Sequence, residues 1–123
     1  ELPISDSGIR QTPTALCEAA EKYIIEKKPE LLAICFEEPD HTGHTKGHDT
    51  PAYYQMLKEL DGYVERILQA IKKAGIWDDT IIIMTADHGG IKTGHGGKTL
   101  REMEIPFIIS GKNVRKGRKS KKV

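Results

Sequence analysis

Residues 50–90 read TPAYYQMLKELDGYVERILQAIKKAGIWDDTIIIMTADHGG, a helical pattern followed by a strand pattern. Thr50 can cap a helix that runs to Ala74, and Gly75 lies just past its predicted end. The apolar residues of this helix recur at helical spacing, at Tyr53, Leu57, Leu60, Val64, Ile67, Leu68 and Ile71. The run Thr80–Ala86 is apolar without alternation, which is typical of a strand that is covered on both faces.

The same kinds of pattern occur on either side of this stretch. Thr12 or Thr14 can cap an earlier helix that Pro29 terminates, with apolar residues at Leu16, Ala19, Ala20, Tyr23 and Ile24. Leu31–Phe36 follows as a continuous apolar run, and Ile105–Ile109 forms a third run near the end of the chain. Each of these two runs predicts a strand.

The order of elements predicts an α/β fold. Helices that link apolar strands favour a parallel sheet with flanking helices and right-handed crossovers. Three strands make a thin sheet for this fold class, so we expect residues 1–111 to form part of a larger α/β domain. Residues 112–123 form a basic tail that we expect to be flexible.

The charge is distributed unevenly. Seven of the 19 Lys and Arg residues lie in the last twelve positions, and none of the 18 acidic residues does, which leaves residues 1–111 with a net charge of −6. A body of this charge argues against a nucleic-acid-binding domain, which usually presents a basic face. No apolar run approaches the roughly 20 residues that a membrane-spanning helix needs.

Other features are less informative. Cys35 lies in an apolar run and is expected to be buried, while Cys17 lies on the first predicted helix, and their spacing does not argue for a disulfide. Glu1–Arg10 lacks the basic region and apolar stretch of a signal peptide, and the compartment stays open.

Clusters of acidic residues and histidines follow the first two predicted strands. One lies in a polar loop expected over Glu37–Asp49, and the other begins at Asp87 and extends to His95. Ligands of open α/β sheets bind beyond the carboxyl ends of the strands, where both clusters lie. Carboxylate and imidazole are ligands that catalytic zinc accepts, and Asp40 and His44 would converge if the backbone turned at Gly43.

Two alternatives stay open at this point. Histidines in polar loops are often simply solvated. A structural zinc site could also be built within the first loop from His41, His44 and His48.

Three motifs occur in order: Glu38-Pro39-Asp40-His41-Thr42-Gly43-His44 with Gly47, then Ala86-Asp87-His88-Gly89, then His95-Gly96. Over about Leu31–Gly111 the chain closely resembles the nucleotide pyrophosphatase/phosphodiesterase (type I phosphodiesterase) branch of the alkaline phosphatase superfamily. The resemblance implies an alkaline-phosphatase-like partial domain from the C-terminal part of the family fold. It also implies a hydrolase that cleaves phosphate esters through a covalent phospho-enzyme.

The resemblance further implies two divalent metal ions, Zn²⁺ as the first choice and Mn²⁺ as the alternative. One metal would be held by Asp40, His44 and His95, and the other by Asp87 and His88 together with a further Asp. The family nucleophile, a Thr or Ser, comes from an upstream segment that has no match here. Thr42 and Thr45 lie in the wrong motif and are not assigned this role, so we expect the chain alone to be a poor or inactive hydrolase.

The expected partners are a phosphate-ester or nucleotide-like small molecule and the missing N-terminal part of the same domain, with neither a nucleic acid polymer nor a membrane. Sulfatases, phosphonate hydrolases and phosphoglycerate mutases of the same superfamily are alternatives. A non-catalytic zinc-binding module is another. Members of the family are often periplasmic or extracellular.

Overall fold

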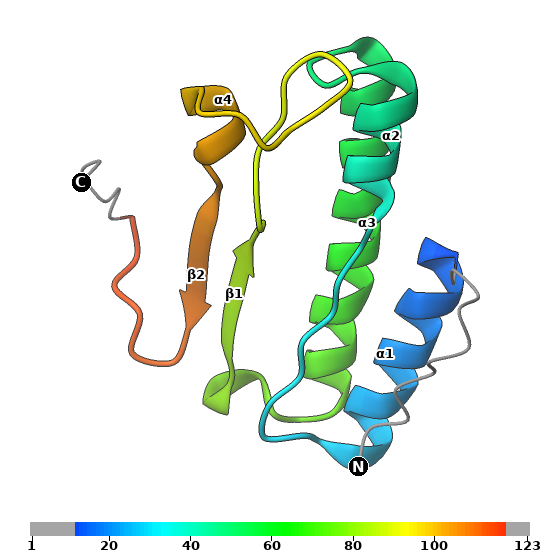
Figure 1. Cartoon of the computed structure of the whole chain (residues 1–123). Coiled ribbons are helices and arrows are strands. Elements are labelled where there is room, and N and C mark those ends of the chain that lie inside the picture. The colour runs from blue at the N-terminus through cyan, green and yellow to red at the C-terminus, as the bar shows by residue number, and fades with distance from the viewer. Residues whose placement is uncertain (1–11, 118–123) are drawn as a thin grey trace.

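The computed structural model describes residues 12–117. Along this part of the chain the elements are α1 (Pro13–Lys27), α2 (Glu38–Lys46), α3 (Pro51–Lys73), the 3₁₀ turn η1 (Trp77–Asp79), β1 (Ile81–Thr85), α4 (Leu100–Met103) and β2 (Phe107–Gly111). Figure 1 shows α1 lying against α3, with α2 at one end of α3 and the two strands on the other side. No helix among these residues is long and apolar enough to cross a membrane.

The two long helices begin at the caps that the sequence predicts. The Thr12 hydroxyl accepts a hydrogen bond from the Ala15 amide at the start of α1, and the Thr50 hydroxyl accepts one from the Tyr53 amide at the start of α3. Proline follows each cap directly, where its missing N–H costs nothing. Both helix predictions are therefore confirmed.

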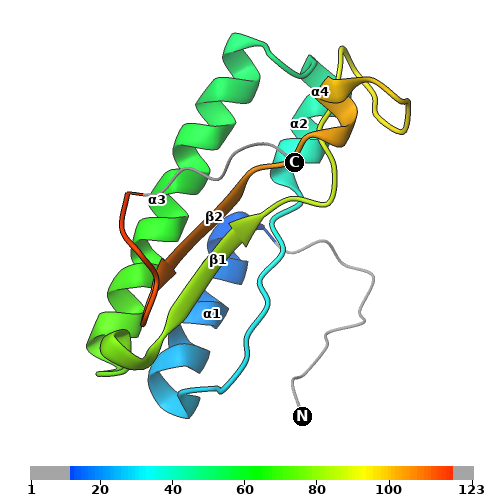
Figure 2. The same ribbon diagram turned by 90° about the vertical axis from the view of Figure 1, so that its left-hand side faces the viewer.

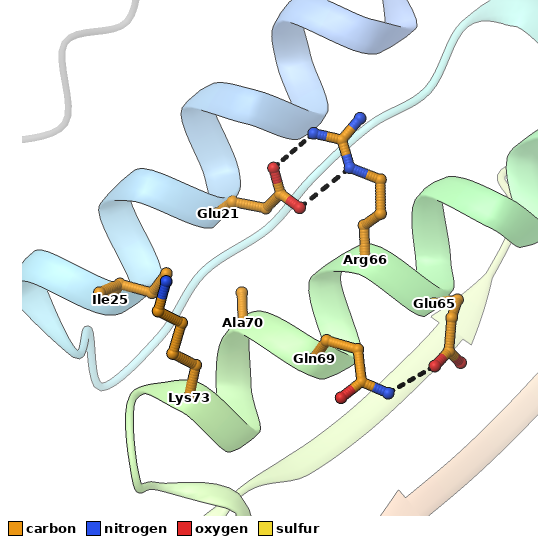
Figure 3. A pocket seen from close by; sticks show the side chains of 7 residues that line it. All are labelled: Glu21, Ile25, Glu65, Arg66, Gln69, Ala70 and Lys73. Carbon is orange, nitrogen blue, oxygen red and sulfur yellow. Dashed lines mark hydrogen bonds and ion pairs between the residues drawn. The ribbon is translucent and has the colours of Figure 1, made fainter.

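The core lies between α1 and α3 and extends to the turn after α3. Its buried residues are Cys17, Ala20, Ile24, Ala70, Ile71 and Ala74. The small side chains of Ala20 on α1 and Ala70 on α3 are both buried there. A forked ion pair joins the same helices at their margin, where the Arg66 guanidinium donates to both oxygens of Glu21, at 3.0 and 2.5 Å (Figure 3).

The sheet differs from the prediction. Over residues 12–117 it has two strands, and β1 pairs with β2 antiparallel, with Ile81 opposite Gly111 and Thr85 opposite Phe107. A parallel return would need a crossover of a dozen or more residues, usually a long helix, to carry the chain back to the other end of the sheet. Residues 86–106 are long enough for such a crossover, but they form loops and the four-residue α4 beyond the end of β1, so β2 begins where β1 stops. The third predicted strand exists, displaced by two residues from Ile105–Ile109 to Phe107–Gly111.

The prediction of a first strand at Leu31–Phe36 is also wrong, because this segment pairs with no strand among the described residues. It climbs from α1 to α2 in the same general direction as β1 (Figures 1 and 2). Its side chains alternate, with Leu32, Ile34 and Phe36 half-buried and the residues between them exposed. The segment is thus extended and one face is covered, but it lacks a ladder of hydrogen bonds.

One consequence is that Cys35 is exposed rather than buried. It lies on the uncovered face of this segment, since nothing in the described part of the chain packs there. The sheet is similarly bare. Among the large apolar side chains of its strands, Ile82 packs at the edge of the core, whereas Ile81, Ile83, Met84, Phe107, Ile108 and Ile109 are exposed.

Candidate metal centre

Asp40 and His44 lie on a helix rather than in the loop that was expected over Glu37–Asp49. Acidic residues in the first turn of α2 and proline at its start favour a helix N-terminus, and Gly47, at φ +92°, ends it. Four residues apart on one helix face, the two side chains meet without a sharp turn at Gly43. Asp40 Oδ2 lies 3.4 Å from His44 Nε2.

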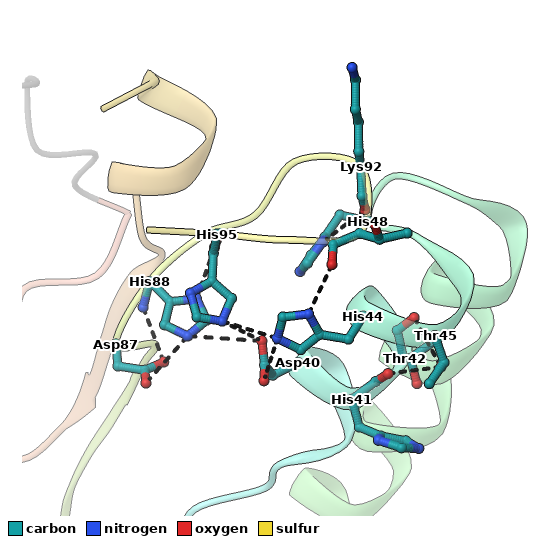
Figure 4. Close-up of polar contacts among 12 residues, drawn as sticks. Asp40, His41, Thr42, His44, Thr45, His48, Asp87, His88, Lys92 and His95 are labelled. Carbon is teal, nitrogen blue, oxygen red and sulfur yellow. Dashed lines mark hydrogen bonds and ion pairs between the residues drawn. The ribbon is translucent and has the colours of Figure 1, made fainter. Parts of the chain in front are cut away.

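The chain after β1 supplies the other histidines. Asp87 and His88 follow the strand directly, and His95 follows a tight turn in which Ile91 and Gly94 exchange backbone hydrogen bonds of 2.9 and 3.0 Å. The imidazoles of His88 and His95 stack with their centroids 3.7 Å apart. The loop thereby presents two histidines side by side to α2 (Figure 4).

Asp40 is the point at which these groups converge. Its Oδ1 lies 3.4 Å from His95 Nε2 and 3.9 Å from His88 Nε2, and His44 Nε2 lies 3.1 Å from His95 Nε2. The ligand atoms of Asp40, His44 and His95 all fall within 4.8 Å of one another, the one such group of three among residues 12–117.

The chemistry of this cluster fits a cation. Asp40 Oδ1 is buried without a hydrogen-bond partner, although the side chain as a whole is 43% exposed. Such an atom is costly unless a positive charge or a donor satisfies it. The Nε2 atoms of His95 and His88 face this oxygen, and His44 Nε2 faces the other oxygen of the same carboxylate. Neutral imidazole nitrogen is a common ligand of divalent transition metals.

Two backbone carbonyls fix the tautomers of these rings. His44 Nδ1 lies 2.9 Å from the Thr93 carbonyl, and His88 Nδ1 lies 2.9 Å from the Gly89 carbonyl. Because a carbonyl only accepts, each Nδ1 carries the hydrogen, and in the neutral ring Nε2 keeps a free lone pair. In both rings this lone pair faces Asp40, which is the orientation that a metal ligand requires.

Asp87 lies at the edge of the cluster. Its carboxylate accepts a hydrogen bond of 3.0 Å from the His88 amide, and its Oδ2 lies 3.6 Å from His88 Nε2. The side chain is 87% exposed. Asp87 and His88 therefore form an open pair beside the Asp40 group, and nothing else among the described residues completes it to a group of three.

The alternative zinc site of His41, His44 and His48 does not assemble. His41 points away from the cluster, and His48 contacts the Lys92 carbonyl instead (Figure 4). The ring centroids of His44 and His48 are 6.4 Å apart.

Sequence reasoning missed three features of the site. The carbonyls of Thr93 and Gly89 carry no side-chain signal that could have identified them. Glu102 did carry a signal, because Thr99-x-x-Glu102 is the pattern of a capping box. The tyrosine next to the cluster, Tyr53, is half-buried, and burial, followed by the negative charge of Asp40, raises its pKa.

The chain matches one known protein family. The profile of the family "Type I phosphodiesterase / nucleotide pyrophosphatase" matches residues 5–105. Bis(5'-adenosyl)-triphosphatase enpp4 of Xenopus laevis is 43% identical over 60 residues, which is 48% of this chain and 13% of that protein. Ectonucleotide pyrophosphatase/phosphodiesterase family member 5 of Homo sapiens is 32% identical over 69 residues, 55% of this chain and 14% of that protein.

Family member 7 of Mus musculus is 34% identical over 68 residues, 55% of this chain and 16% of that protein. The chain thus spans only about a seventh of the length of the curated relatives that it matches. No solved structure gives a significant match.

Proposed function

Because the chain belongs to the type I phosphodiesterase/nucleotide pyrophosphatase family of the alkaline phosphatase superfamily, we propose that it forms the metal-binding part of a hydrolase that cleaves phosphate esters of nucleotide-like small molecules. The observation that carries the proposal is the Asp40 carboxylate, whose buried, unpartnered Oδ1 faces His88 and His95 while its Oδ2 faces His44. The names of the relatives indicate nucleotide substrates.

We assign Asp40, His44 and His95 to one divalent metal, with Zn²⁺ as the first choice and Mn²⁺ as the alternative. Asp87 and His88 supply half of a second site. Two divalent ions held in this way would offset the negative charge on a phosphoryl group, as two-metal hydrolases do.

The residues of the chain would prepare this chemistry. The Asp40 carboxylate supplies negative charge at the centre, and the histidines approach it from two directions, His44 from α2 and His95 from the loop. The Thr93 carbonyl holds the His44 ring in the tautomer and orientation that leave Nε2 available. Loss of such contacts behind a ligand typically lowers metal affinity about 10- to 100-fold.

The nucleophile would come from outside this chain. The Thr45 hydroxyl donates to the His41 carbonyl at 2.8 Å, within its own helix, and so is already used. We therefore expect the chain to bind metal and to turn over phosphodiesters poorly. Loss of a nucleophile that works as part of a unit costs on the order of 10⁶ in rate. The exposed apolar face of the sheet is consistent with a contact to further parts of the domain.

Zinc titration by calorimetry tests the proposal. Asp40→Asn should weaken Zn²⁺ binding about a hundredfold or more, because it removes the only carboxylate of the three-ligand group. Asp87→Asn, which changes an exposed carboxylate at the edge of the cluster, should have a smaller effect and is the matched control. His41→Ala should leave the affinity unchanged.

The metal assignment fails if the unmodified chain binds no Zn²⁺, or if Asp40→Asn and Asp87→Asn weaken binding equally. Turnover of a chromogenic phosphodiester at ordinary enzyme rates, roughly 1–10³ s⁻¹, would show that the nucleophile lies within the chain.

A further inference from the structure

His48 lies just beyond the end of α2 and is bound to the loop that carries His95. Its backbone amide donates to the Lys92 carbonyl at 2.6 Å, and its ring Nδ1 donates to the same carbonyl at 3.1 Å. The next carbonyl along the chain, that of Thr93, accepts from His44 Nδ1. Two successive peptide groups of one turn therefore hold two histidines of the α2 region.

The His48 ring also lies between two glycines. Its Nε2 is directed at Gly43, which lies next to His44 in α2, and at Gly90, which lies two residues after His88. A methyl group added at either glycine would overlap the imidazole. Neither glycine has a positive φ, so backbone conformation does not require glycine at these positions. Glycine fits both positions because the His48 ring occupies the space that a side chain would need.

We propose that His48 is a positioning residue that sets the distance between α2 and the loop of residues 88–95. One side of the proposed metal centre, Asp40 and His44, belongs to the helix, and the other, His88 and His95, belongs to the loop. The imidazole of His48 acts as a spacer between these two parts, and its bond to Lys92 fixes the turn directly before His95. The predicted effect on metal binding rests on the proposed function, whereas the role of His48 as a spacer does not.

A set of substitutions separates the two contributions of the ring. His48→Asn keeps a donor near the position of Nδ1 and removes most of the ring, whereas His48→Phe keeps the ring and removes the donor. His48→Ala removes both. His41→Ala, on the neighbouring helix α2 and outside the cluster, is the matched control. In the complete chain, His48→Ala should weaken Zn²⁺ binding about ten- to a hundredfold, the range typical of residues that orient ligands.

The visible absorption of bound Co²⁺ gives a readout that a general loss of stability would not change. The spectrum of His48→Ala at saturating Co²⁺ should differ from that of the unmodified chain, since the histidines approach the ion from altered directions. His48→Asn should restore part of both the affinity and the spectrum. The His41→Ala spectrum should match that of the unmodified chain.

A double substitution tests the spacer directly. Gly43→Ala alone should weaken Zn²⁺ binding, because the added methyl group displaces the ring. In the His48→Ala background the same change should have no further effect, because the group that it would strike is absent. Additive effects of the two substitutions would overturn the proposal, as would an unchanged affinity and Co²⁺ spectrum in His48→Ala.

A measurement without metal distinguishes failure of this inference from failure of the proposed function. Amide hydrogen exchange at Ile91 and Gly94 should accelerate at least tenfold in His48→Ala and stay unchanged in His41→Ala. If the unmodified chain binds no metal, the metal centre is wrong, yet this exchange result still decides the role of His48. Unchanged exchange in His48→Ala would refute it.

Discussion

Glu102 organises the loop of the candidate metal centre from outside it. Its carboxylate accepts hydrogen bonds from the Gly97 amide at 2.8 Å and from the Thr99 hydroxyl at 2.5 Å, and its own carbonyl accepts one from the Gly89 amide. The residue is buried. Through these bonds one side chain and its backbone connect the segment after His95 to the segment after His88.

The Glu102 carboxylate should make the folding stability of the chain fall at low pH. The Thr99 hydroxyl and then the Gly97 amide lower the pKa of Glu102 from its ordinary value of 4.5. A lowered folded-state pKa gives a stabilisation that is full above this ordinary value and is lost as the pH falls through the lower folded-state pKa. Glu102→Gln should therefore flatten the dependence of the urea midpoint on pH below about pH 5. Glu26→Gln, an exposed substitution on α1, should leave this pH dependence of the urea midpoint unchanged.

At the level of single residues, the sequence indicates which side chains meet but not what orients them. The resemblance to the family grouped Asp40, His44 and His95, and the structure brings their ligand atoms within 4.8 Å of one another. The orientation of the rings depends on carbonyls of Thr93 and Gly89, and every residue has a carbonyl. Only the path of the backbone decides which one faces an imidazole.

Helix α2 shows where element prediction from local signals fails. Residues 37–49 contain two glycines and three histidines, and such a composition has low intrinsic helix propensity. The sequence therefore predicted a loop here. The helix forms nevertheless, since its start carries acidic residues and proline and its buried Gly43 packs against the His48 ring. The long helices, in contrast, were predictable because cap, apolar stripe and terminator all agree.

The predicted sheet failed for a different reason. Apolar runs identify residues that can form strands, but they do not specify direction. Direction depends on the path of the connection, and here residues 86–106 form loops and the short α4 beyond the end of β1, with no helix that returns along the sheet. For Leu31–Phe36 the run indicated an extended segment correctly, while pairing requires a neighbour that the described residues do not provide.

The junction of α2 and α3 depends on a single hydroxyl. Thr50 accepts from the Tyr53 amide at 3.2 Å and donates to the Gly47 carbonyl at 2.8 Å, so it caps one helix and holds the end of the other. Thr12 caps α1 with one bond of 3.2 Å at an exposed position.

Thr50→Ala should accordingly destabilise the chain by about 1–2 kcal/mol, and Thr12→Ala by about 0.5–1 kcal/mol. Urea unfolding followed by circular dichroism measures both. Equal losses for the two variants would mean that the bond to Gly47 contributes nothing to stability.

At the scale of the whole molecule, the packing is one-sided. The core joins α1 to α3, whereas the strands contribute Ile82 at its edge and leave six large apolar side chains of the sheet exposed. A two-stranded sheet is marginal without a packed face. The basic segment from residue 112 begins at an anchored residue, since Lys112 pairs with Asp79 at 2.5 Å, and residues 118–123 lie outside the described part of the chain.

The alkylation rates of the two cysteines report on this one-sided packing. Cys17 is fully buried between α1 and α3, near the Tyr63 carbonyl, and burial raises the pKa of its thiol. Cys35 is exposed on the uncovered face of its segment. Since alkylating agents attack the accessible thiolate, Cys35 should react directly, and Cys17 only when the helices separate.

In native buffer we expect iodoacetamide to label Cys17 roughly a hundredfold more slowly than Cys35, or slower still. Mass spectrometry would resolve the two steps, and concentrated guanidinium should make the rates similar. Equal rates in native buffer would contradict the burial of Cys17. The delay between the first and second adduct therefore times the spontaneous opening of the helix pair, without any introduced probe.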